Sequence, residues 1–271
     1  MEILVCVKRV PTVGGAITLT ADRRAIDTRM SGFAISPHEE CAVEEAVRLV
    51  ERFGGSVTVA TLGPAAAEEQ LRACLALGAS AAVLLETEPG VEVGPIATAA
   101  ALHSVAIGTA GTPAGGGFDL VLLGNEASDT GDYQVGIRLA HLLGWPAATG
   151  IKALSVDDAG ISASASRTYR GVLETFALEL PCVVTVKEGI NLPRYPSLPG
   201  RLRAKRAAIT RVPGPAGASA GVSGGASAAQ DVRMTSLRVP DARKKQAVVL
   251  GQGAGAVPAL VDVLVELGVV S

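Results

Sequence analysis

The chain has 271 residues, of which 48% are hydrophobic and 3% aromatic, with a mean hydropathy of +0.38 and a formal net charge of −2. These values favour a large buried core of aliphatic side chains and give no overall attraction to nucleic acid or anionic membranes. The net charge of −2 therefore favours no nucleic-acid partner. Because no apolar run of 18 residues is free of charges and helix breakers, we also expect no membrane insertion.

Apolar strands alternate with helical segments over the first half of the chain. A strand is predicted at residues 3–7, followed by a hairpin at 16–20 and 25–27. Apolar spacing predicts further strands at 56–62, 81–85 and 120–123, and helices at 37–53, 64–77, 93–107 and 134–143. The alternation predicts an α/β fold whose mostly parallel, twisted sheet carries helices on both faces.

The first helix has a clear start signal. Ser36 is a candidate N-cap, Pro37 suits the first helical position, and Glu39 is the capping-box partner. Acidic residues 39, 40, 44 and 45 are expected to lie mostly on a solvated face of this helix.

The segment 120–136 carries the main candidate site. The predicted strand ends at Gly124, a polar loop follows, and a helix begins near Gln134. Backbone N–H groups of such a loop can cradle a phosphate, and Asp129 and Asp132 could fix the loop or bind a ribose. An ordinary βα loop explains the same pattern equally well. Cys6 and Leu62 lie at the ends of their predicted strands, as Gly124 does, so we expect all three to share one crevice.

The pattern changes after residue 146. Strands are predicted at 149–156, 161–168, 171–178 and 182–186, as an antiparallel addition to the sheet or a small sheet beside it. Three prolines and two glycines in residues 188–206 argue against long regular structure there. On this stiff loop Leu198 reads as an exposed apolar anchor or as a side chain tucked under the loop. The basic run 201–206 reads as a solvated or partner-facing segment.

The remaining signals concern the C-terminus and chemistry. Residues 212–229 are rich in Gly, Ala and Ser, and 247–270 predict an apolar strand, a glycine-rich turn and a helix.

The three histidines lack metal-ligand spacing, so we expect no metal site, and no nucleophile motif or phosphate-loop lysine occurs. The four cysteines form no CxxC pair and the chain opens on a strand, which together predict reduced thiols and a cytoplasmic location.

Taken together, these motifs resemble one known family, the beta subunits of electron transfer flavoproteins. The matching stretches are Val-Cys-Val-Lys-Arg-Val at 5–10, Pro-His-Glu-Glu-Cys-Ala-Val-Glu-Glu-Ala at 37–46, Leu-Gly-Pro at 62–64, the Gly-x-x-Ala-x-Asp-x-x-x-x-Gln-x-Gly of 124–136, Leu-Pro-Cys-Val-Val-Thr at 180–185 and Asn-Leu-Pro-Arg-Tyr-Pro-Ser-Leu-Pro at 191–199. The similarity runs to about residue 208 and returns weakly in the C-terminal helix.

The resemblance implies an electron carrier subunit without catalytic residues of its own. Its partner would be an alpha subunit that holds most of the FAD on a mobile domain, while this chain would hold AMP or a second FAD. The fold would be of the adenine nucleotide alpha hydrolase type. The implied nucleotide contacts are Cys6, Ser36, Pro37, His38, Glu39, Leu62, Gly124, Asn125, Glu126, Ala127, Ser128, Asp129, Thr130, Gly131, Asp132, Tyr133, Gln134 and Val135.

The resemblance also implies contacts with other proteins. Leu198, with Tyr195 and Pro199, matches a recognition loop at 188–206 that docks flavin dehydrogenases such as acyl-CoA dehydrogenases, with a quinone oxidoreductase downstream. Glu174 matches a glutamate that pairs with an alpha-subunit arginine. The implied domains are 1–208, with the nucleotide site and recognition loop, a linker at 209–230, and a C-terminal arm at 231–271 that packs on the alpha subunit.

Some positions depart from the family pattern. Aromatic residues that approach the flavin in some members align with Val13 and His38, and the order Asp-Thr-Gly-Asp at 129–132 differs from that of bifurcating members. AMP and a second FAD therefore both stay open. A stand-alone adenine-nucleotide-binding or hydrolysing domain is the alternative function.

Overall fold

The computed structural model describes residues 1–12, 14, 15, 17–91, 93–109, 117–215, 232, 234–240 and 247–270. The chain divides into two compact units, Met1–Ser236 and Leu237–Ser271. No helix among these residues is long and apolar enough to cross a membrane.

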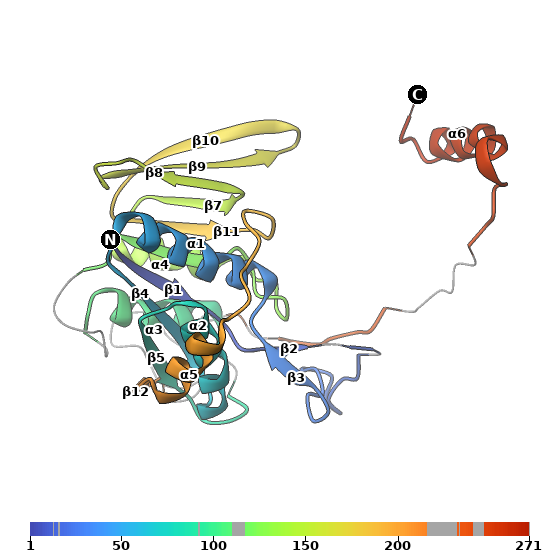
Figure 1. Cartoon of the computed structure of the whole chain (residues 1–271). Helices are drawn as coiled ribbons and strands as arrows, with labels where there is room; N and C mark the ends of the chain where they lie inside the picture. The colour runs from blue at the N-terminus through green and yellow to red at the C-terminus, as the bar shows by residue number, and fades with distance from the viewer. Residues whose placement is uncertain are drawn as a thin grey trace. The chain divides into compact units, whose positions relative to one another are not determined.

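A seven-stranded sheet forms the centre of the first unit (Figure 1). Its order is β12-β5-β4-β1-β6-β11-β7, and every neighbouring pair is parallel. The strands are β1 (Glu2–Cys6), β4 (Ser56–Gly63), β5 (Ala81–Glu86), β6 (Leu120–Gly124), β7 (Ala147–Ile151), β11 (Cys182–Val186) and β12 (Thr210–Pro213). The predicted parallel sheet is thus confirmed.

Helices cover both faces of this sheet, as predicted. In β1, Ile3 and Val5 point to one face and Leu4 and Cys6 to the other, because successive side chains of a strand alternate. The first face packs against α1 (Pro37–Phe53), the short η1 (Ala65–Ala67), α2 (Glu68–Leu77) and α5 (Leu198–Arg206). The second face packs against α3 (Pro95–Ala106) and α4 (Val135–Leu143).

The strands after residue 146 divide between two sheets. β8 (Ala153–Val156), β9 (Ser162–Tyr169) and β10 (Val172–Glu179) form a separate antiparallel sheet, as one of our alternatives stated. β7 and β11, however, join the main sheet in parallel, so the antiparallel prediction was wrong for them. Every residue of β11 is buried, which is typical of an interior parallel strand.

Two further segments differ from the predicted elements. β2 (Val10–Thr12) and β3 (Gly32–Ala34) form an unpredicted two-stranded sheet. The predicted hairpin is reduced to one antiparallel bridge between Leu19 and Ile26, and its first residue lies outside the described ranges.

The proline-rich segment ends in a helix that the composition argument missed. Ser197 caps α5 by accepting the Gly200 N–H at 3.1 Å, and Pro199 lies in the first turn. Proline is tolerated there because first-turn N–H groups have no intrahelical partner, so Leu198 opens a helix instead of lying within a loop. The sheet continues to Pro213, past the boundary we placed at residue 208.

The second unit is small. Within it, η3 (Gly253–Ala256) leads into α6 (Val257–Glu266), and none of the residues of either helix is buried. The strand we predicted before this turn is absent, since residues 247–250 form no strand. Most of the predicted linker, 216–230, lies outside the described residues.

Candidate functional site

The carboxyl ends of the central strands meet where the sheet order reverses. β1 pairs with β4 on one side and with β6 on the other, so Cys6 lies opposite both Ala60 and Leu123. In open α/β sheets, ligands bind outside the strands at such a switch point. Cys6 and Gly124 are therefore close neighbours, as the sequence predicted.

The start of α1 packs directly against the end of β6. A Cβ atom on Gly124 would lie 2.8 Å from Glu39 Cγ and 3.1 Å from His38 Cβ, so a larger residue would push the helix away. Ser36 Oγ donates to the Glu126 carbonyl at 3.4 Å. The structure thus brings residues 36–39, with Pro37 as the first residue of α1, beside the loop that follows β6.

Glu39 closes the predicted capping box from a buried position. Its Oε2 accepts the Ser36 backbone N–H at 2.9 Å and its Oε1 accepts the Lys8 backbone N–H at 3.0 Å. Burial raises the pKa of Glu39 to about 8, although the hydrogen bonds from Ser36 and Lys8 oppose that shift. Glu39 is only 5% exposed, so the expected solvated face was wrong at this position.

A lysine that we did not predict fixes the loop after β6. Lys8 Nζ lies 2.7 Å from Asp129 Oδ2 and also donates to Thr130 Oγ1 at 3.4 Å. Asp129 Oδ1 accepts the Thr130 backbone N–H at 2.8 Å as well. Asp129 therefore shapes the loop, one of the two roles we considered for it. The sequence feature that could have identified Lys8 is its position directly after the predicted strand 3–7, at the carboxyl end of the sheet where ligands bind.

The other end of this loop is tied to β11. The Asn125 backbone N–H donates to the Val186 carbonyl at 2.9 Å, and its Oδ1 accepts from Thr185 Oγ1 at 2.9 Å. A Cβ atom on Gly136 would lie 2.4 Å from Thr185 Cγ2. Glycine at 136 lets the start of α4 approach the sheet this closely.

The start of α4 presents free backbone donors. None of the described side chains caps α4, and the N–H groups of residues 132–135 have no partner among the described residues. Gln134 does not cap the helix, because its Oε1 accepts hydrogen bonds from Arg138 at 2.7 and 3.1 Å. Helix N-termini of this kind bind anions through backbone N–H groups and the helix dipole.

The loop itself turns through left-handed conformations. Gly131 has φ +60° and its N–H donates to the Ala127 carbonyl, while Tyr133 has φ +57°. A hydrogen bond to the Glu126 carboxylate raises the pKa of Tyr133. Ser128 is exposed and Asp132 is half-buried, and Asp132 makes no hydrogen bond or ion pair with the described residues.

Three other predicted residues border this crevice. His38 is half-buried, burial lowers its pKa, and its Nδ1 is enclosed without a hydrogen-bond partner among the described residues. Val135 packs into the core between the sheet and the helices of the second face. Leu62 lies at the same sheet edge, but its side chain lies beside Gly214, on the β12 side.

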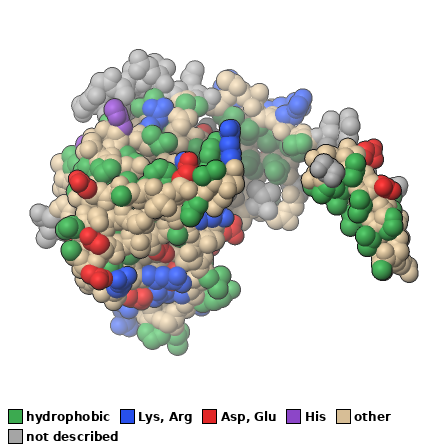
Figure 2. Space-filling view, turned by 90° about the horizontal axis from the view of Figure 1, so that it is seen from above, with side chains coloured by type: hydrophobic (Ala, Val, Ile, Leu, Met, Phe, Trp, Pro, Cys, Tyr) green, Lys and Arg blue, Asp and Glu red, His purple; other side chains and the backbone are tan. Residues whose placement is uncertain are grey.

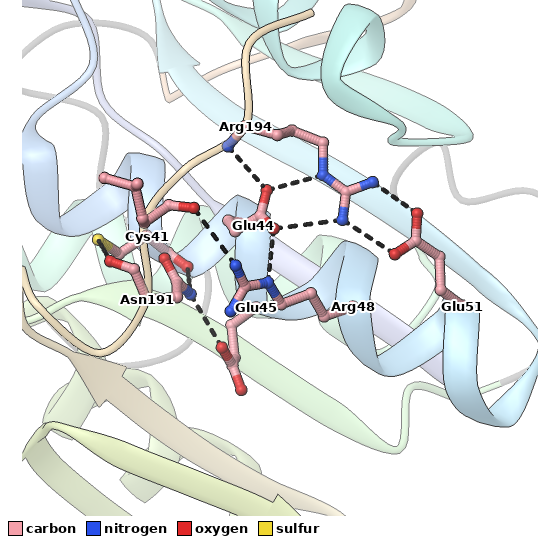
Figure 3. Close-up of polar contacts among 8 residues, drawn as sticks. Cys41, Glu44, Glu45, Arg48, Glu51, Asn191 and Arg194 are labelled. Atoms are coloured by element: carbon pink, nitrogen blue, oxygen red, sulfur yellow. Dashed lines mark hydrogen bonds and ion pairs between the residues drawn. The ribbon is translucent and has the colours of Figure 1, made fainter.

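The segment from the end of β11 into the first turn of α5 exposes large apolar side chains. Leu192 is 82% exposed, Tyr195 94% and Leu198 72%, and Pro199 is exposed too. Its backbone lies along α1, whose Glu44 and Glu45 are 2% and 8% exposed and pair with Arg194 and Asn191 (Figure 3). Our prediction that these two glutamates face solvent was therefore wrong, while the exposed position of Leu198 is confirmed.

Glu174 already has a partner within the chain. It lies opposite Arg167 in the β9–β10 pair, and its Oε2 is 2.7 Å from Arg167 Nε. Arg167 also donates to the Thr149 carbonyl at 2.7 Å, which ties the small sheet to β7.

Charges of both signs lie on the described part of the surface that Figure 2 shows. On the face shown in Figure 2, basic and acidic side chains lie interspersed, in keeping with the net charge of −2.

Comparisons with known proteins identify the family to which the sequence is similar. Residues 25–216 match the family model described as "Electron transfer flavoprotein domain". The chain is 40% identical over 173 residues to the electron transfer flavoprotein subunit beta of Bacillus subtilis, an alignment that covers 64% of each chain. It is 36% identical to the mitochondrial subunit beta of Oryza sativa (78% of this chain, 81% of that one). It is 35% identical to the human subunit beta (77% and 80%).

Proposed function

The chain belongs to the electron transfer flavoprotein family, and we propose from this that it is the beta subunit of a heterodimeric electron carrier. Its partner is an alpha subunit that holds most of an FAD. The complex takes electrons from flavin dehydrogenases, for example acyl-CoA dehydrogenases, and passes them to a quinone oxidoreductase. The observation that supports the proposal is that one chain of this family combines unpartnered backbone N–H groups at the start of α4 with exposed apolar side chains at 192, 195 and 198.

We propose AMP as the ligand of the crevice. The free N–H groups of residues 132–135 suit its phosphate, and the enclosed Nδ1 of His38 offers a polar atom that lacks a partner. Gly124 lets α1 pack tightly against the end of β6, which holds residues 36–39 beside the loop that would bind AMP. Cys6 lines the site through its backbone, because its side chain is buried and burial raises the pKa of its thiol.

FAD supplies the electron transfer chemistry when it is bound to the complex. Transfer between flavins needs proximity and not acid–base groups, so this chain contributes by positioning its partners. Of the two positions that align with flavin-contacting aromatic residues, Val13 lies outside the described residues and His38 borders the crevice.

We further propose that Leu198, with Tyr195 and Pro199, docks the dehydrogenase. Exposed apolar side chains on an anchored backbone are typical of binding hot spots, because little ordering entropy is lost on docking. Leu198→Ala is expected to slow reduction by a cognate dehydrogenase while AMP and FAD contents stay unchanged. Leu142→Ala, which truncates another exposed leucine near the end of α4, is the control. Equal rates for Leu198→Ala and the wild type would refute the docking role.

Glu174 is proposed to bias the position of the flavin domain. An alpha-subunit arginine that reaches it must share the carboxylate with Arg167, which now holds it at 2.7 Å. We expect Glu174→Ala to change the solution scattering profile of the complex. An identical profile would reject this role.

Mass spectrometry of the small molecules released from the purified complex tests the main proposal. One FAD plus AMP supports it as stated, and two FAD would replace AMP as the ligand in the crevice. A colourless protein that purifies alone and hydrolyses ATP would overturn it in favour of a stand-alone adenine-nucleotide domain.

A further inference from the structure

Few backbone hydrogen bonds hold the docking loop, residues 188–199. At its ends the Ile190 N–H donates to the Lys187 carbonyl at 3.3 Å, and the Ser197 carbonyl accepts the Arg201 N–H at 2.9 Å. Pro193, Pro196 and Pro199 have no N–H group. Over residues 191–199, all of which the structure describes, the one backbone N–H with a partner is that of Arg194, which donates to Glu44 Oε2 at 3.1 Å. A segment of this kind needs other contacts to keep one shape.

The Arg194 side chain supplies such contacts by joining two carboxylates of α1 (Figure 3). Its Nε and Nη2 donate to the two oxygens of Glu44 at 2.9 and 3.2 Å. Its Nη1 and Nη2 donate to the two oxygens of Glu51, the second at 2.9 Å. Planar guanidinium groups favour this double two-point geometry, which fixes orientation as well as distance.

Glu44 is the buried centre of this cluster. Besides Arg194 it accepts from Arg48 Nε at 2.6 Å. Burial by itself raises the pKa of Glu44, but the hydrogen bonds from Arg194 and Arg48 outweigh burial and hold its pKa below the ordinary value. A buried carboxylate is stable only when it is paired, so α1 and the docking loop need each other here.

Further contacts fix the two ends of the docking loop. Asn191 Nδ2 donates to the Cys41 carbonyl at 3.0 Å and to Glu45 Oε2 at 2.8 Å. At the other end, a Cβ on Gly200 would lie 2.4 Å from the Ala76 carbonyl oxygen, so α5 starts tightly against α2. With both ends held, the exposed side chains of Leu192, Tyr195 and Leu198 have fixed starting points.

We propose that Arg194, Glu44 and Glu51 are positioning residues that hold the docking loop in the shape its dehydrogenase partner recognises. The proposal rests on the docking role of Leu198 proposed above. These residues touch no reacting group. They act by keeping the apolar anchors in place before the partner arrives, so that their ordering does not have to occur during docking.

The test measures reduction of the intact complex by a cognate dehydrogenase, with the complex as the varied substrate. Glu51→Gln weakens the outer, half-exposed side of the clamp, and Arg194→Lys keeps the charge but removes the planar fork. We expect KM to rise on the order of tenfold in both variants, because glutamine leaves Arg194 a single uncharged acceptor oxygen and lysine cannot make the two-point contacts. We expect kcat, AMP and FAD contents to stay at wild-type values.

Arg52→Gln is the matched control. Arg52 lies on the same helix as Glu44 and Glu51, and the substitution breaks its exposed ion pair, at 2.7 Å, with Asp158 in the turn between β8 and β9. It does not touch the docking loop. Its KM should equal that of the wild type. Hydrogen exchange of the full complex adds a readout that needs no partner, and in the two clamp variants exchange should speed up at Arg194, the one amide of residues 191–199 that has a partner.

The outcomes separate this inference from the function on which it rests. If Leu198→Ala raises KM while Glu51→Gln and Arg194→Lys leave both KM and exchange unchanged, the positioning role is wrong and docking stands. If Leu198→Ala itself leaves KM unchanged, the docking proposal fails first. A fall in kcat with no rise in KM in the clamp variants also overturns the positioning role.

Discussion

Replacing Glu39 with glutamine should flatten the dependence of stability on pH. Glu39 lies beside the crevice with 5% of its surface exposed, and burial raises its pKa from 4.5 to about 8. Glutamine keeps the shape of the side chain but cannot ionise. The variant therefore removes one titration from the folded state and leaves the rest of the chain as it is.

The sign follows from proton binding in the two states. Between pH 4.5 and about 8 the folded chain keeps the Glu39 proton while the unfolded chain releases it. The contribution of Glu39 to stability is thus fully present below pH 4.5 and is lost as the pH rises through about 8. The slope can reach about 1.4 kcal/mol per pH unit and the total about 5 kcal/mol.

Urea unfolding of the full chain at pH values from 5 to 8.5 measures the effect. At pH 5 the variant should be less stable by about 1–3 kcal/mol, because its amide NH2 group faces a backbone donor. This gap should narrow steadily as the pH rises, because only the wild type loses stability through Glu39, and by pH 8.5 it should close or reverse in favour of the variant. Glu69→Gln, which changes an exposed glutamate in the first turn of α2, should keep the wild-type profile. A gap that stays constant or widens with pH would refute the reasoning.

Three further predictions concern the same region. Gly136→Ala should cost about 1–3 kcal/mol of stability in urea unfolding, because the new Cβ would lie 2.4 Å from Thr185 Cγ2, whereas Gly117→Ala, into open space, should be neutral. Lys8→Gln should lower the amount of AMP retained on gel filtration by freeing the loop at Asp129, and unchanged retention would argue against the role of Lys8. All four cysteines are free and buried, and burial raises their pKa, so a native-state thiol reagent at pH 8 should label them far more slowly than it labels urea-unfolded chain; rapid native labelling would contradict this.

The sequence predicted most of the central sheet and the outline of the crevice. Apolar runs and helical spacing are local properties, and they placed β1, β4, β5, β6 and their helices within a few residues. The capping box at Ser36 and Glu39 was likewise readable from three-residue spacing. The glycines at 124 and 136 could be recognised as important, although the atoms they approach could not.

Other predictions failed because the deciding partner lies far away in the sequence. Glu44 looks like a solvated helix residue until Arg194, 150 residues later, covers it. β11 reads as part of an antiparallel series, yet its neighbours are β6 and β7. In both cases the local spacing of residues does not show which distant segment packs alongside. That segment determines whether Glu44 is buried and whether β11 pairs in parallel.

By itself, then, the sequence determined the alternation of strands and helices, the glycine-rich loop after β6 and the family to which the chain belongs. These depend on backbone preferences and on residue spacing within a few turns or strands. Only the tertiary structure decided that Lys8 holds Asp129, that Glu39 and Glu44 are buried, and that α1 both borders the crevice and anchors the docking loop. Those features arise from long-range contacts, whose energies depend on burial and pairing and which no local pattern in the chain encodes.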